Sequence, residues 1–589
     1  MLNKQMVLCC GLALQAVCGV QASALADELP TQPVVQVNIP AHLDDLINKA
    51  MQPVLNTAQV RDEGDAWQLF RRLRPAIRDA LGAKGYFSPV ISRIAPPPQA
   101  QGEQALALRI VVDLGPQAVV SALDIQFEGD ILLPEFANRR AHLLSQWGLG
   151  TGQPFDQDAW ARSKDDVLRD LLANDFAAAT LAQSEALVDP EANTVALRLV
   201  YDSGPVFTFG ELQIDGLKKF KPDLVQRYNT IEPGTPYAQE RVLELQAELQ
   251  GARYFSSVDV AVDVDDQTPK QVPIHVHLVE GDSKRLSAGA GYSSNTGFRT
   301  EAAYEWNNLF DRAYALSTAA RLEQKRQSAY ADVYLPPSRK GVVDSLGIAV
   351  DHQAVSNLEV DRTSLGAVRQ YTQGLTDVRL GLNFQLENRS TQGVDFGGTQ
   401  ALVGSMAWTR NRVDDRLNPR AGYIAFTQVA AASEALASNQ DFVRLYGKWQ
   451  HFWSPSKPHV VSSRVELGTV LSSAQRDIPQ DYLFRAGGSN SIRGFDFLDL
   501  GVRDQGVLVG GRRLFIGSLE YTRWLENNIG LAVFSDAGNV ADHWRDAGPK
   551  VALGTGVRYK TPAGSIAFDV AKALSEEKIR MHFALGLAF

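Results

Sequence analysis

The 589-residue chain is poor in cysteine: it has only Cys9, Cys10 and Cys18. They fall in a segment that predicts a secretory signal peptide over residues 1–26, with Lys4, an apolar run over 6–20 and small residues before residue 27. Once this segment is removed, no cysteine is left in the mature chain. This excludes a disulfide framework and thiol chemistry.

Two further absences narrow the class of protein. After residue 26, no stretch approaches the roughly 18 uninterrupted apolar residues of a membrane-spanning helix. The formal net charge is −9, and charges of one sign are nowhere concentrated. The basic face that a nucleic-acid partner needs is therefore missing. We expect a secreted protein of a Gram-negative cell envelope, without a nucleic-acid partner.

The sequence also lacks the motifs of common hydrolases and nucleotide-binding enzymes. It contains no Gly-x-Ser-x-Gly, no His-Glu-x-x-His and no P-loop. His275 and His277 lie on one face of a predicted strand, but no third or fourth metal ligand is evident beside them. We therefore expect no enzymatic activity, no cofactor and no bound metal.

Three similar units follow the signal segment. Each opens with a short alternating strand, continues through helical stretches and closes with two strands, the last of which stops at a glycine. A phenylalanine near the fourth element and the closing glycine recur with nearly the same spacing from unit to unit. These landmarks are Phe87, Phe176 and Phe255, and Gly115, Gly204 and Gly281. The spacing predicts three β-α-α-β-β units, at residues 27–116, 117–205 and 206–282.

This repeated unit resembles the POTRA domain. A unit of about 75–90 residues can bury a small core of its own. The open edges of its sheet could receive an extended segment by strand addition. We therefore expect the repeats to bind clients or partners, with a role as periplasmic spacers as the alternative.

From residue 283 to residue 589, short alternating strands replace the helices. In residues 378–387, every even-numbered residue is apolar, and the others are polar, charged or glycine. The last residues, 581–589, alternate in the same way and end in Phe589. The pattern favours an all-β transmembrane barrel of about 16 antiparallel strands, with apolar side chains facing lipid and polar ones lining the lumen.

Two connections in this region are distinctive. If the repeats lie in the periplasm, the connection after the eighth strand is periplasmic and the one after the eleventh is extracellular. The first is the hairpin 414–423, where proline and glycine set the turn and Asp and Asn side chains bond the local backbone. Its candidate residues are Asp415, Asn418, Pro419 and Gly422. The second spans 472–510, a length that is abnormal unless the loop is functional or folded inward.

Two short motifs belong with the long connection. Ile492-Arg493-Gly494-Phe495 lies within it, and Phe534-Ser535-Asp536-Ala537-Gly538 lies one hairpin later. With the hairpin 414–423 and the aromatic C-terminus, these motifs resemble those of the BamA/TamA-type outer-membrane assembly superfamily. The presence of three repeats resembles its TamA-type branch. Five repeats would be typical of BamA-type insertases, and two repeats of two-partner secretion exporters.

The resemblance implies that the tetrapeptide lies at the tip of an extracellular loop folded into the barrel. Alternation with Leu531 and Val533 places Phe534 and Asp536 in the lumen. Glu520, between two apolar residues, points inward as well.

Arg493 needs an acidic partner when it leaves water, and its planar guanidinium suits carboxylates. We predict that Arg493 pairs with Asp536, with Glu520 as a second acceptor. Gly494 would permit the sharp reversal of the chain, and Phe495 would pack against the barrel wall. The predicted role of this pair is to lock the loop, without catalysis.

A barrel must also pair its first and last strands, here near residues 285–292 and 579–589. Gly289, Gly291 and Gly586 would weaken this lateral seam, which ends at Phe589, because glycine lowers strand stability and packs little. A frayed seam would expose backbone groups to which a client strand could add. The alternative is that these small residues accommodate the curvature of the barrel.

The resemblance implies an outer-membrane assembly factor that inserts or translocates β-barrel proteins, autotransporters especially. Its implied partners are a TamB-like protein anchored in the inner membrane, unfolded outer-membrane clients, and outer-membrane lipid. The alternative from another class is a two-partner-type export pore for a secreted adhesin. That alternative requires a plug helix before the first repeat, for which residues 27–33 leave no room.

Overall fold

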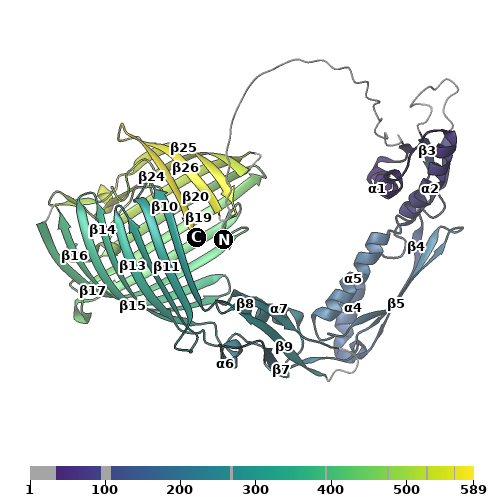
Figure 1. Cartoon of the computed structure of the whole chain (residues 1–589), viewed down its shortest axis with the longest axis horizontal. Coiled ribbons are helices and arrows are strands. Elements are labelled where there is room, and N and C mark those ends of the chain that lie inside the picture. The colour runs from purple at the N-terminus through teal and green to yellow at the C-terminus, as the bar shows by residue number, and fades with distance from the viewer. Residues whose placement is uncertain are drawn as a thin grey trace, which may run out of the picture. The chain divides into compact units, whose positions relative to one another are not determined.

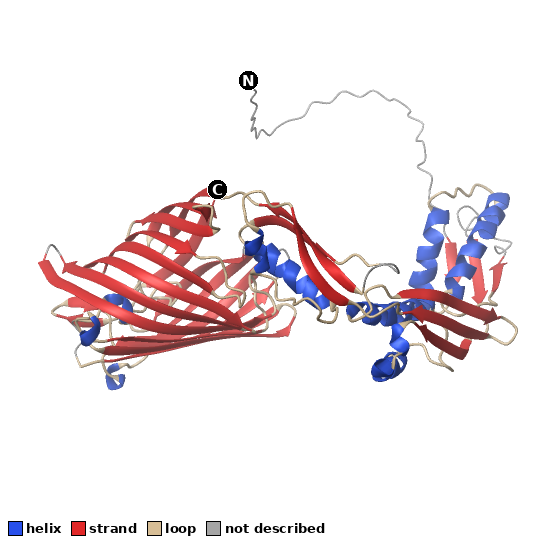
Figure 2. Ribbon diagram, turned by 90° about the horizontal axis from the view of Figure 1, so that it is seen from below, coloured by secondary structure: helices blue, strands red, loops and turns tan. Residues whose placement is uncertain are grey.

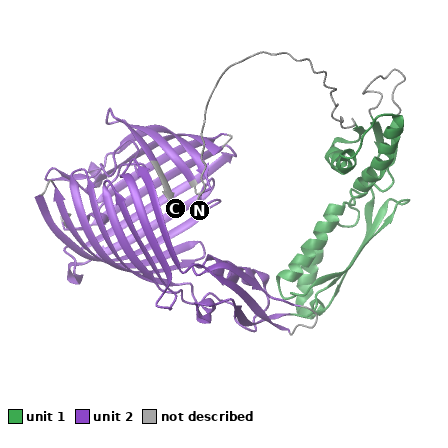
Figure 3. Ribbon diagram, in the orientation of Figure 1, with its two compact units in different colours: residues 1–206 green, residues 207–589 purple. Residues whose placement is uncertain are grey.

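The computed structural model describes residues 35–94, 108–264, 270–391, 394–473, 477–525, 528–562 and 564–588. The chain divides into two compact units at residues 206 and 207 (Figure 3). The predicted signal peptide and Phe589 lie outside the described residues.

The first unit contains two repeats of the predicted β-α-α-β-β type (Figures 1 and 2). In each, the last strand is central, parallel to the first strand and antiparallel to the one before it. The first repeat consists of β1 (Val35–Asn38), α1 (Asp44–Leu55), α2 (Glu63–Gly82), β2 (Val90–Ile94) and β3 (Leu108–Asp113). The second consists of β4 (Val119–Glu128), α4 (Ala137–Ser145), α5 (Gln157–Ala173), β5 (Thr180–Asp189) and β6 (Thr194–Asp202).

Helix α2 shows how the local sequence builds these repeats. The Asp62 side chain accepts a hydrogen bond from the backbone N–H of Asp65 at 2.8 Å and so caps the helix. Leu73, Ile77 and Leu81 follow at intervals of four residues, which places them on one face of the helix. All three are fully buried, together with apolar residues of the sheet. The first repeat therefore has its own core.

The third repeat belongs to the second unit, with the barrel. It consists of β7 (Thr208–Asp215), α6 (Pro222–Gln226), α7 (Gln239–Gly251), β8 (Phe255–Ala261) and β9 (Gln271–Glu280). The Tyr254 hydroxyl donates to the carbonyl of Ala313, in the first periplasmic turn of the barrel, at 2.9 Å. The guanidinium of Arg253 lies over the ring of Tyr334, 4.7 Å from its centroid. These contacts hold the repeat against the barrel.

The predicted barrel of 16 antiparallel strands is confirmed, and it is closed. Its first eight strands are β10 (Lys284–Ser293), β11 (Gly297–Leu309), β12 (Tyr314–Glu323), β13 (Arg326–Tyr334), β14 (Val343–Val355), β15 (Leu358–Gln373), β16 (Thr376–Thr391) and β17 (Val394–Val413). The other eight are β18 (Gly422–Ala432), β19 (Phe442–Ser456), β20 (His459–Leu471), β23 (Arg513–Trp524), β24 (Ile529–Ala541), β25 (Lys550–Thr561), β26 (Gly564–Ala573) and β27 (Ile579–Ala588). The long connection follows the eleventh strand and contains a hairpin of its own, β21 (Val502–Asp504) and β22 (Val507–Val509).

Side chains alternate across the barrel wall as the sequence predicts. In β16, Leu382 and Leu386 are 52% and 46% exposed on the outside, whereas Gln385 and Glu387 are buried inside. Among the described residues, no helix has the length and apolar character needed to cross a bilayer.

The lumen differs from the sequence expectation, because part of it is apolar. Residues of the long connection form a buried cluster with inward-facing residues of β17–β20 and β23–β26. Its members from the connection are Ile478, Leu483, Phe484, Ala486, Ile492, Phe495 and Leu500. Four of the ten wall residues in the cluster are alanine, Ala552 and Ala573 among them, and these small side chains leave space for the loop. Polar residues line only part of the lumen, and the folded loop supplies a core for the rest.

The first and last strands meet at the seam, where β27 changes partner along its length. Residues 579–583 pair with β26, and residues 584–588 pair with β10, each over five described residue pairs. By comparison, β16 and β17 pair over fifteen. Gly291 lies opposite Gly586, and Gly289 lies opposite Ala588. The seam is thus closed by few pairs, one of which is glycine against glycine.

Candidate functional site

The middle of the long connection forms a compact tip that lies inside the barrel. The tip, residues 487–495, is closed by a hydrogen bond from the N–H of Gly488 to the carbonyl of Phe495, at 3.1 Å. Gly487, Gly488 and Gly494 have φ values of 106°, 100° and 91°. Other residues adopt such values only with strain. The glycines thus allow the reversal that carries Arg493 to the wall.

Arg493 and Asp536 form the central contact of the site. The Arg493 Nε and Nη2 atoms donate to the two carboxylate oxygens of Asp536, at 2.8 and 2.9 Å. The backbone N–H of Arg493 donates to the same carboxylate at 3.0 Å. Asp536 is fully buried, and Arg493 is 6% exposed. A planar two-pronged contact of this kind is strong and specific in orientation.

Glu520 and two further charged residues extend this contact. The Arg493 Nη1 atom donates to Glu520 at 2.6 Å and to Asp569 at 3.3 Å. Arg558 lies on the other side of both carboxylates, 2.7 Å from Glu520 and 2.5 Å from Asp569. We call these five residues, Arg493, Glu520, Asp536, Arg558 and Asp569, the Arg493 cluster. Its three carboxylates and two guanidiniums come from the loop and from β23, β24, β25 and β26.

The sequence analysis placed Arg493, Asp536 and Glu520 together, and the structure brings them into contact. It did not identify Arg558 and Asp569 as partners, although a signal was present. Each is a charged residue between large apolar ones, in strands whose alternation was clear. Charges at inward positions of adjacent strands must find partners in the lumen, because unpaired buried charges are costly.

Apolar contacts complete the fit around the cluster. The Arg493 guanidinium lies 3.3 Å from the ring centroid of Phe534, in a cation–π contact. Ile492 and Phe495, which flank Arg493 and Gly494 in the chain, are fully buried. A Cβ atom at Gly538 would lie 2.9 Å from Ile492, and one at Gly494 would lie 2.9 Å from the Ala552 Cβ. Both glycines thus provide space that a larger residue would fill.

The beginning of the loop is held on the opposite wall by a second ionic group. The N–H of Gln480 donates to both oxygens of Glu387, at 3.0 Å. Arg362 contacts Glu387 at 3.1 Å, Asp351 at 2.9 Å and Asp481 at 3.0 Å. The loop is therefore fixed at two separated places, and the sequence analysis predicted one of them.

The periplasmic hairpin lies at the other end of the lumen. Asp415 accepts from the N–H of Leu417 at 2.8 Å, and Gly422 has a φ of 104° where a Cβ would collide with the carbonyl of Arg412. Asn418 accepts from the Ser565 hydroxyl, near the start of β26, at 2.8 Å. Contacts of this hairpin were expected to be local, and Asn418 instead reaches across the barrel.

Asp414, which the sequence analysis did not single out, organises this hairpin. Its carboxylate accepts from the N–H groups of Asp415, Arg420 and Ala421, at 3.0, 2.9 and 3.0 Å. Burial alone would raise the pKa of Asp414, but these three donors outweigh it and hold that pKa below its ordinary value.

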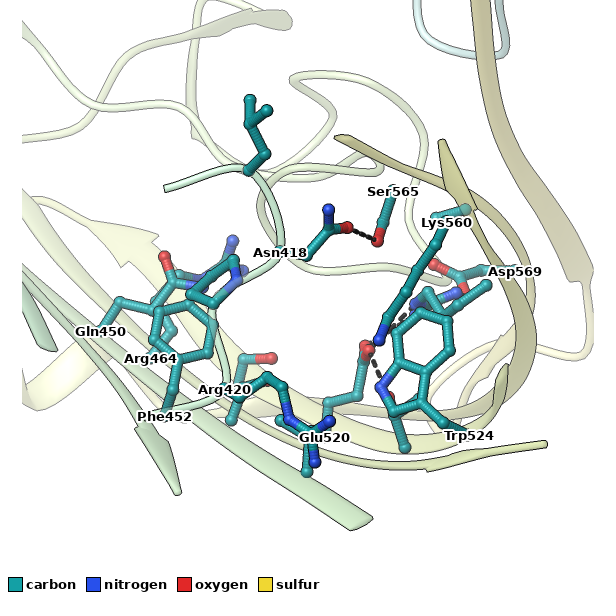
Figure 4. A pocket seen from close by; sticks show the side chains of 18 of the residues that line it. Asn418, Arg420, Gln450, Phe452, Arg464, Glu520, Trp524, Lys560, Ser565 and Asp569 are labelled. Carbon is teal, nitrogen blue, oxygen red and sulfur yellow. Dashed lines mark hydrogen bonds and ion pairs between the residues drawn. The ribbon is translucent and has the colours of Figure 1, made fainter. Parts of the chain in front are cut away.

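The hairpin and the Arg493 cluster enclose a cavity of about 290 Å³ (Figure 4). Its lining includes Leu417, Pro419, Arg420 and members of the cluster. Lys560 lies over the ring of Trp524 at its side, 4.1 Å from the centroid. The part of the lumen between the periplasmic hairpin and the Arg493 cluster is therefore polar, in contrast to the apolar region around the loop.

Comparison with family models agrees with this geometry. The model described as the Omp85 superfamily domain matches residues 281–589, and the POTRA model, described as surface antigen variable number repeat, matches residues 207–281. The chain belongs to the Omp85 superfamily. Its barrel therefore lies in the outer membrane, with the POTRA repeats in the periplasm, as the sequence predicted.

Relatives that the chain matches include BamA proteins. The outer membrane protein assembly factor BamA of Nitratidesulfovibrio vulgaris is 25% identical over 402 residues, which cover 64% of this chain and 50% of the relative. BamA of Neisseria meningitidis serogroup B is 24% identical over 416 residues, covering 63% and 52%. The chain thus spans about half the length of the curated relatives it matches.

A solved structure shows the same fold. BamA from Haemophilus ducreyi lacking POTRA domains 1–3 is similar with a TM-score of 0.67 at 16% sequence identity. The match covers 80% of this chain and 100% of that one. Together with the Omp85 and POTRA family matches and the BamA relatives, which carry the assignment, the predicted membership of the BamA/TamA-type superfamily is confirmed.

Proposed function

We propose that this protein assembles β-barrel proteins, autotransporters in particular, in the outer membrane, by letting client strands pair at its seam. The observation that carries the proposal is the pairing of β27. Its second half, residues 584–588, pairs with β10, and in the described residue pairs it has no partner in β26. Release from β10 would free the backbone groups of both strands at once. A client strand could then satisfy them in a membrane that offers no water.

The repeats offer a second kind of contact. In the first repeat, β2 is an edge strand, and its residues Val90 and Ile94 are 61% and 48% exposed. In the second repeat, β5 is an edge strand with Leu187 exposed. Exposed apolar residues on an open edge favour strand addition by an extended client or partner. No catalytic role is part of the proposal.

The partner that fits three repeats on one barrel is a TamB-like protein anchored in the inner membrane. We place its contact on the first repeat, the one farthest along the chain from the barrel. A photo-cross-linking residue at Val90, introduced in cells, should capture this protein. The same photo-cross-linking residue, placed instead at Leu187, tests the second repeat. Comparing the two positions separates partner binding on the first repeat from client binding on the second. Capture of outer-membrane clients alone at both positions would contradict the TamB-like partner.

The seam route is tested by a disulfide. All native cysteines lie in the predicted signal peptide, so an introduced pair has no competitors in the mature chain. Ala290→Cys with Leu587→Cys bridges facing residues of the seam. Ala288→Cys with Ala302→Cys bridges facing residues of β10 and β11 and is the matched control.

The readout is the folding of a urea-unfolded autotransporter β-domain into proteoliposomes that contain the full-length protein. The oxidised seam pair should slow this folding, and a reductant should restore it. The control pair should have no effect under either condition. Undiminished folding with a fully formed seam disulfide would exclude the seam route. Movement of a secreted adhesin through the disulfide-closed barrel would identify an exporter.

A further inference from the structure

The loop tip contacts the turn at the end of the first strand of the barrel through a reciprocal pair of hydrogen bonds. The Asn295 Nδ2 atom donates to the Ser489 hydroxyl at 2.9 Å, and the N–H of Ser489 donates to the Asn295 Oδ1 atom at 3.1 Å. Asn295 is 9% exposed and lies in the turn between β10 and β11, two residues after the extracellular end of β10. An amide side chain whose donor and acceptor are both satisfied in this way holds one orientation.

The same tip also contacts the last strand of the barrel. The N–H of Gly494 donates to the Nε2 atom of His582, at 2.9 Å. Arg580 donates to the carbonyl of Gly494 at 2.7 Å and to Asp496 at 2.9 Å. His582 is almost fully buried, at 4% exposed. Both backbone groups of Gly494 are thus satisfied by side chains of β27.

These contacts meet at the seam. The last backbone bond between the two strands joins the N–H of Ser294 to the carbonyl of Phe583, at 2.8 Å. The Ser294 hydroxyl accepts from the N–H of Phe583 at 3.1 Å. Continuing this antiparallel register by one residue places Asn295 opposite His582. The two residues that hold the tip therefore face each other across the seam, where the pairing of the strands ends.

Hydrogen bonds within the tip couple its contact with Asn295 to its contact with His582. Ser489 and Gly494 lie on one short turn, which the bond between Gly488 and Phe495 closes. A further bond joins the N–H of Gly487 to the Ser491 hydroxyl, at 3.2 Å. Arg493, between these points, is fixed in the Arg493 cluster. If β10 and β27 moved apart at this end, the tip would lose its contacts on one side.

We propose that the loop tip is a clasp that holds the extracellular end of the seam closed, with Asn295 and His582 as its positioning residues. The clasp joins β10 to β27 through the tip and adds to the five backbone pairs of the seam. Seam opening then requires release of the tip from one of the two strands. Its consequence for assembly rests on the proposed function, whereas its effect on the seam can be measured without a client.

The test is hydrogen–deuterium exchange of the full-length protein in lipid nanodiscs, followed in peptides that cover residues 284–293 and 579–588. His582→Phe keeps a ring but removes the acceptor, and Asn295→Ala removes the contact on the other side. Each should speed exchange in both peptides about fivefold, which is the effect of losing about 1 kcal/mol of hydrogen bonding. The double variant should be little faster than either single one, since both break the same clasp.

Two comparisons separate a clasp from general stabilisation. His582→Gln keeps an acceptor and should exchange more slowly than His582→Phe. Asn383→Ala removes the 3.1 Å hydrogen bond that Asn383 Nδ2, on β16, donates to the hydroxyl of the loop residue Tyr482, and it should leave the seam peptides unchanged. Peptides of β13 and β14 should be unaffected in every variant.

Unchanged seam exchange in both Asn295→Ala and His582→Phe would overturn the clasp. An equal increase over the whole barrel would overturn it as well. Faster seam exchange with unaltered client folding would support the clasp and count against the proposed function.

Discussion

The Arg493 cluster and the seam show two ways of holding one barrel together. The cluster joins a loop to four strands through five interlocked charged side chains, with Asp536 fully buried. The seam joins two strands through five backbone pairs, with glycine facing glycine at one of them. Side-chain networks depend on particular residues, whereas backbone pairing uses N–H and C=O groups that nearly every residue carries. The cluster is thus specified by residue type, whereas the seam is held mainly by groups common to all residues.

The largest effect on the stability of the barrel is expected from Arg493→Ala. The change leaves Asp536 buried without its main partner, and breaking a buried ion pair on one side costs about 3–5 kcal/mol. The temperature at which the barrel loses its compact form on a semi-native gel should fall sharply. Arg503→Ala, at an exposed arginine in the β21–β22 hairpin of the same loop, is the control and should melt as the wild type does. Equal melting of the two variants would show that the cluster does not hold the loop.

Gly494→Ala should have the next largest effect, because two costs add. A left-handed alanine costs about 1–2 kcal/mol, and here its Cβ would also lie 2.9 Å from the Ala552 Cβ and 3.0 Å from the backbone nitrogen of Ala573. Gly506→Ala separates these terms, since Gly506 has a φ of 85° and its Cβ would meet nothing within 4 Å. The temperature of thermal unfolding should therefore be lower for Gly494→Ala than for Gly506→Ala. If both variants lose the same stability, crowding at the wall plays no part.

Gly291→Val should have a smaller effect and should stabilise the seam, whereas the two preceding variants destabilise the barrel. Valine is favoured in strands by up to about 1 kcal/mol, so the seam should open less and the autotransporter β-domain should fold several times more slowly. Gly404→Val makes the same change in β17, where a Cβ has open space, and should not alter client folding. A slower seam exchange without slower client folding would contradict the proposed route.

The smallest effect concerns pH and the periplasmic hairpin below the cluster. Because the pKa of Asp414 is lowered in the folded protein, its carboxylate stabilises the hairpin above the ordinary aspartate range, near pH 4. That stabilisation should be lost as the pH falls through the lowered pKa. Asp414→Asn should remove this part of the pH dependence of thermal unfolding between pH 6 and about pH 3. Asp546→Asn, at an exposed extracellular aspartate, should leave the profile unchanged.

The alternation of residues was sufficient to predict the barrel. Leu382 and Leu386 face outward and Gln385 faces inward because a strand has a period of two, and this holds whatever surrounds it. The same rule placed Asp536 and Glu520 in the lumen before their partner was known. Arg493 was matched to them through the resemblance of its motif, since no local pattern brings residues 493 and 536 together.

The parts that were missed depend on long-range geometry. His582 was one of several small or polar residues on the inner face of the last strand, and its role depends on where the loop tip lies. Asn295 is an ordinary turn residue in sequence, yet the tip lies against it. The apolar region of the lumen was hidden for another reason: Ala552 and Ala573 are small, and only the folded loop makes their surface a core.

Under the proposed seam route, the facing glycines of the seam also bear on which chains can be assembled. Gly291 and Gly586 present no side chains at their position, so nothing there can distinguish one incoming strand from another. An exchange made through backbone groups accepts any segment that can extend and pair. By that route, selection of substrates would be made elsewhere, before a strand arrives. The barrel itself would act as a generalist, with a wide range of passengers.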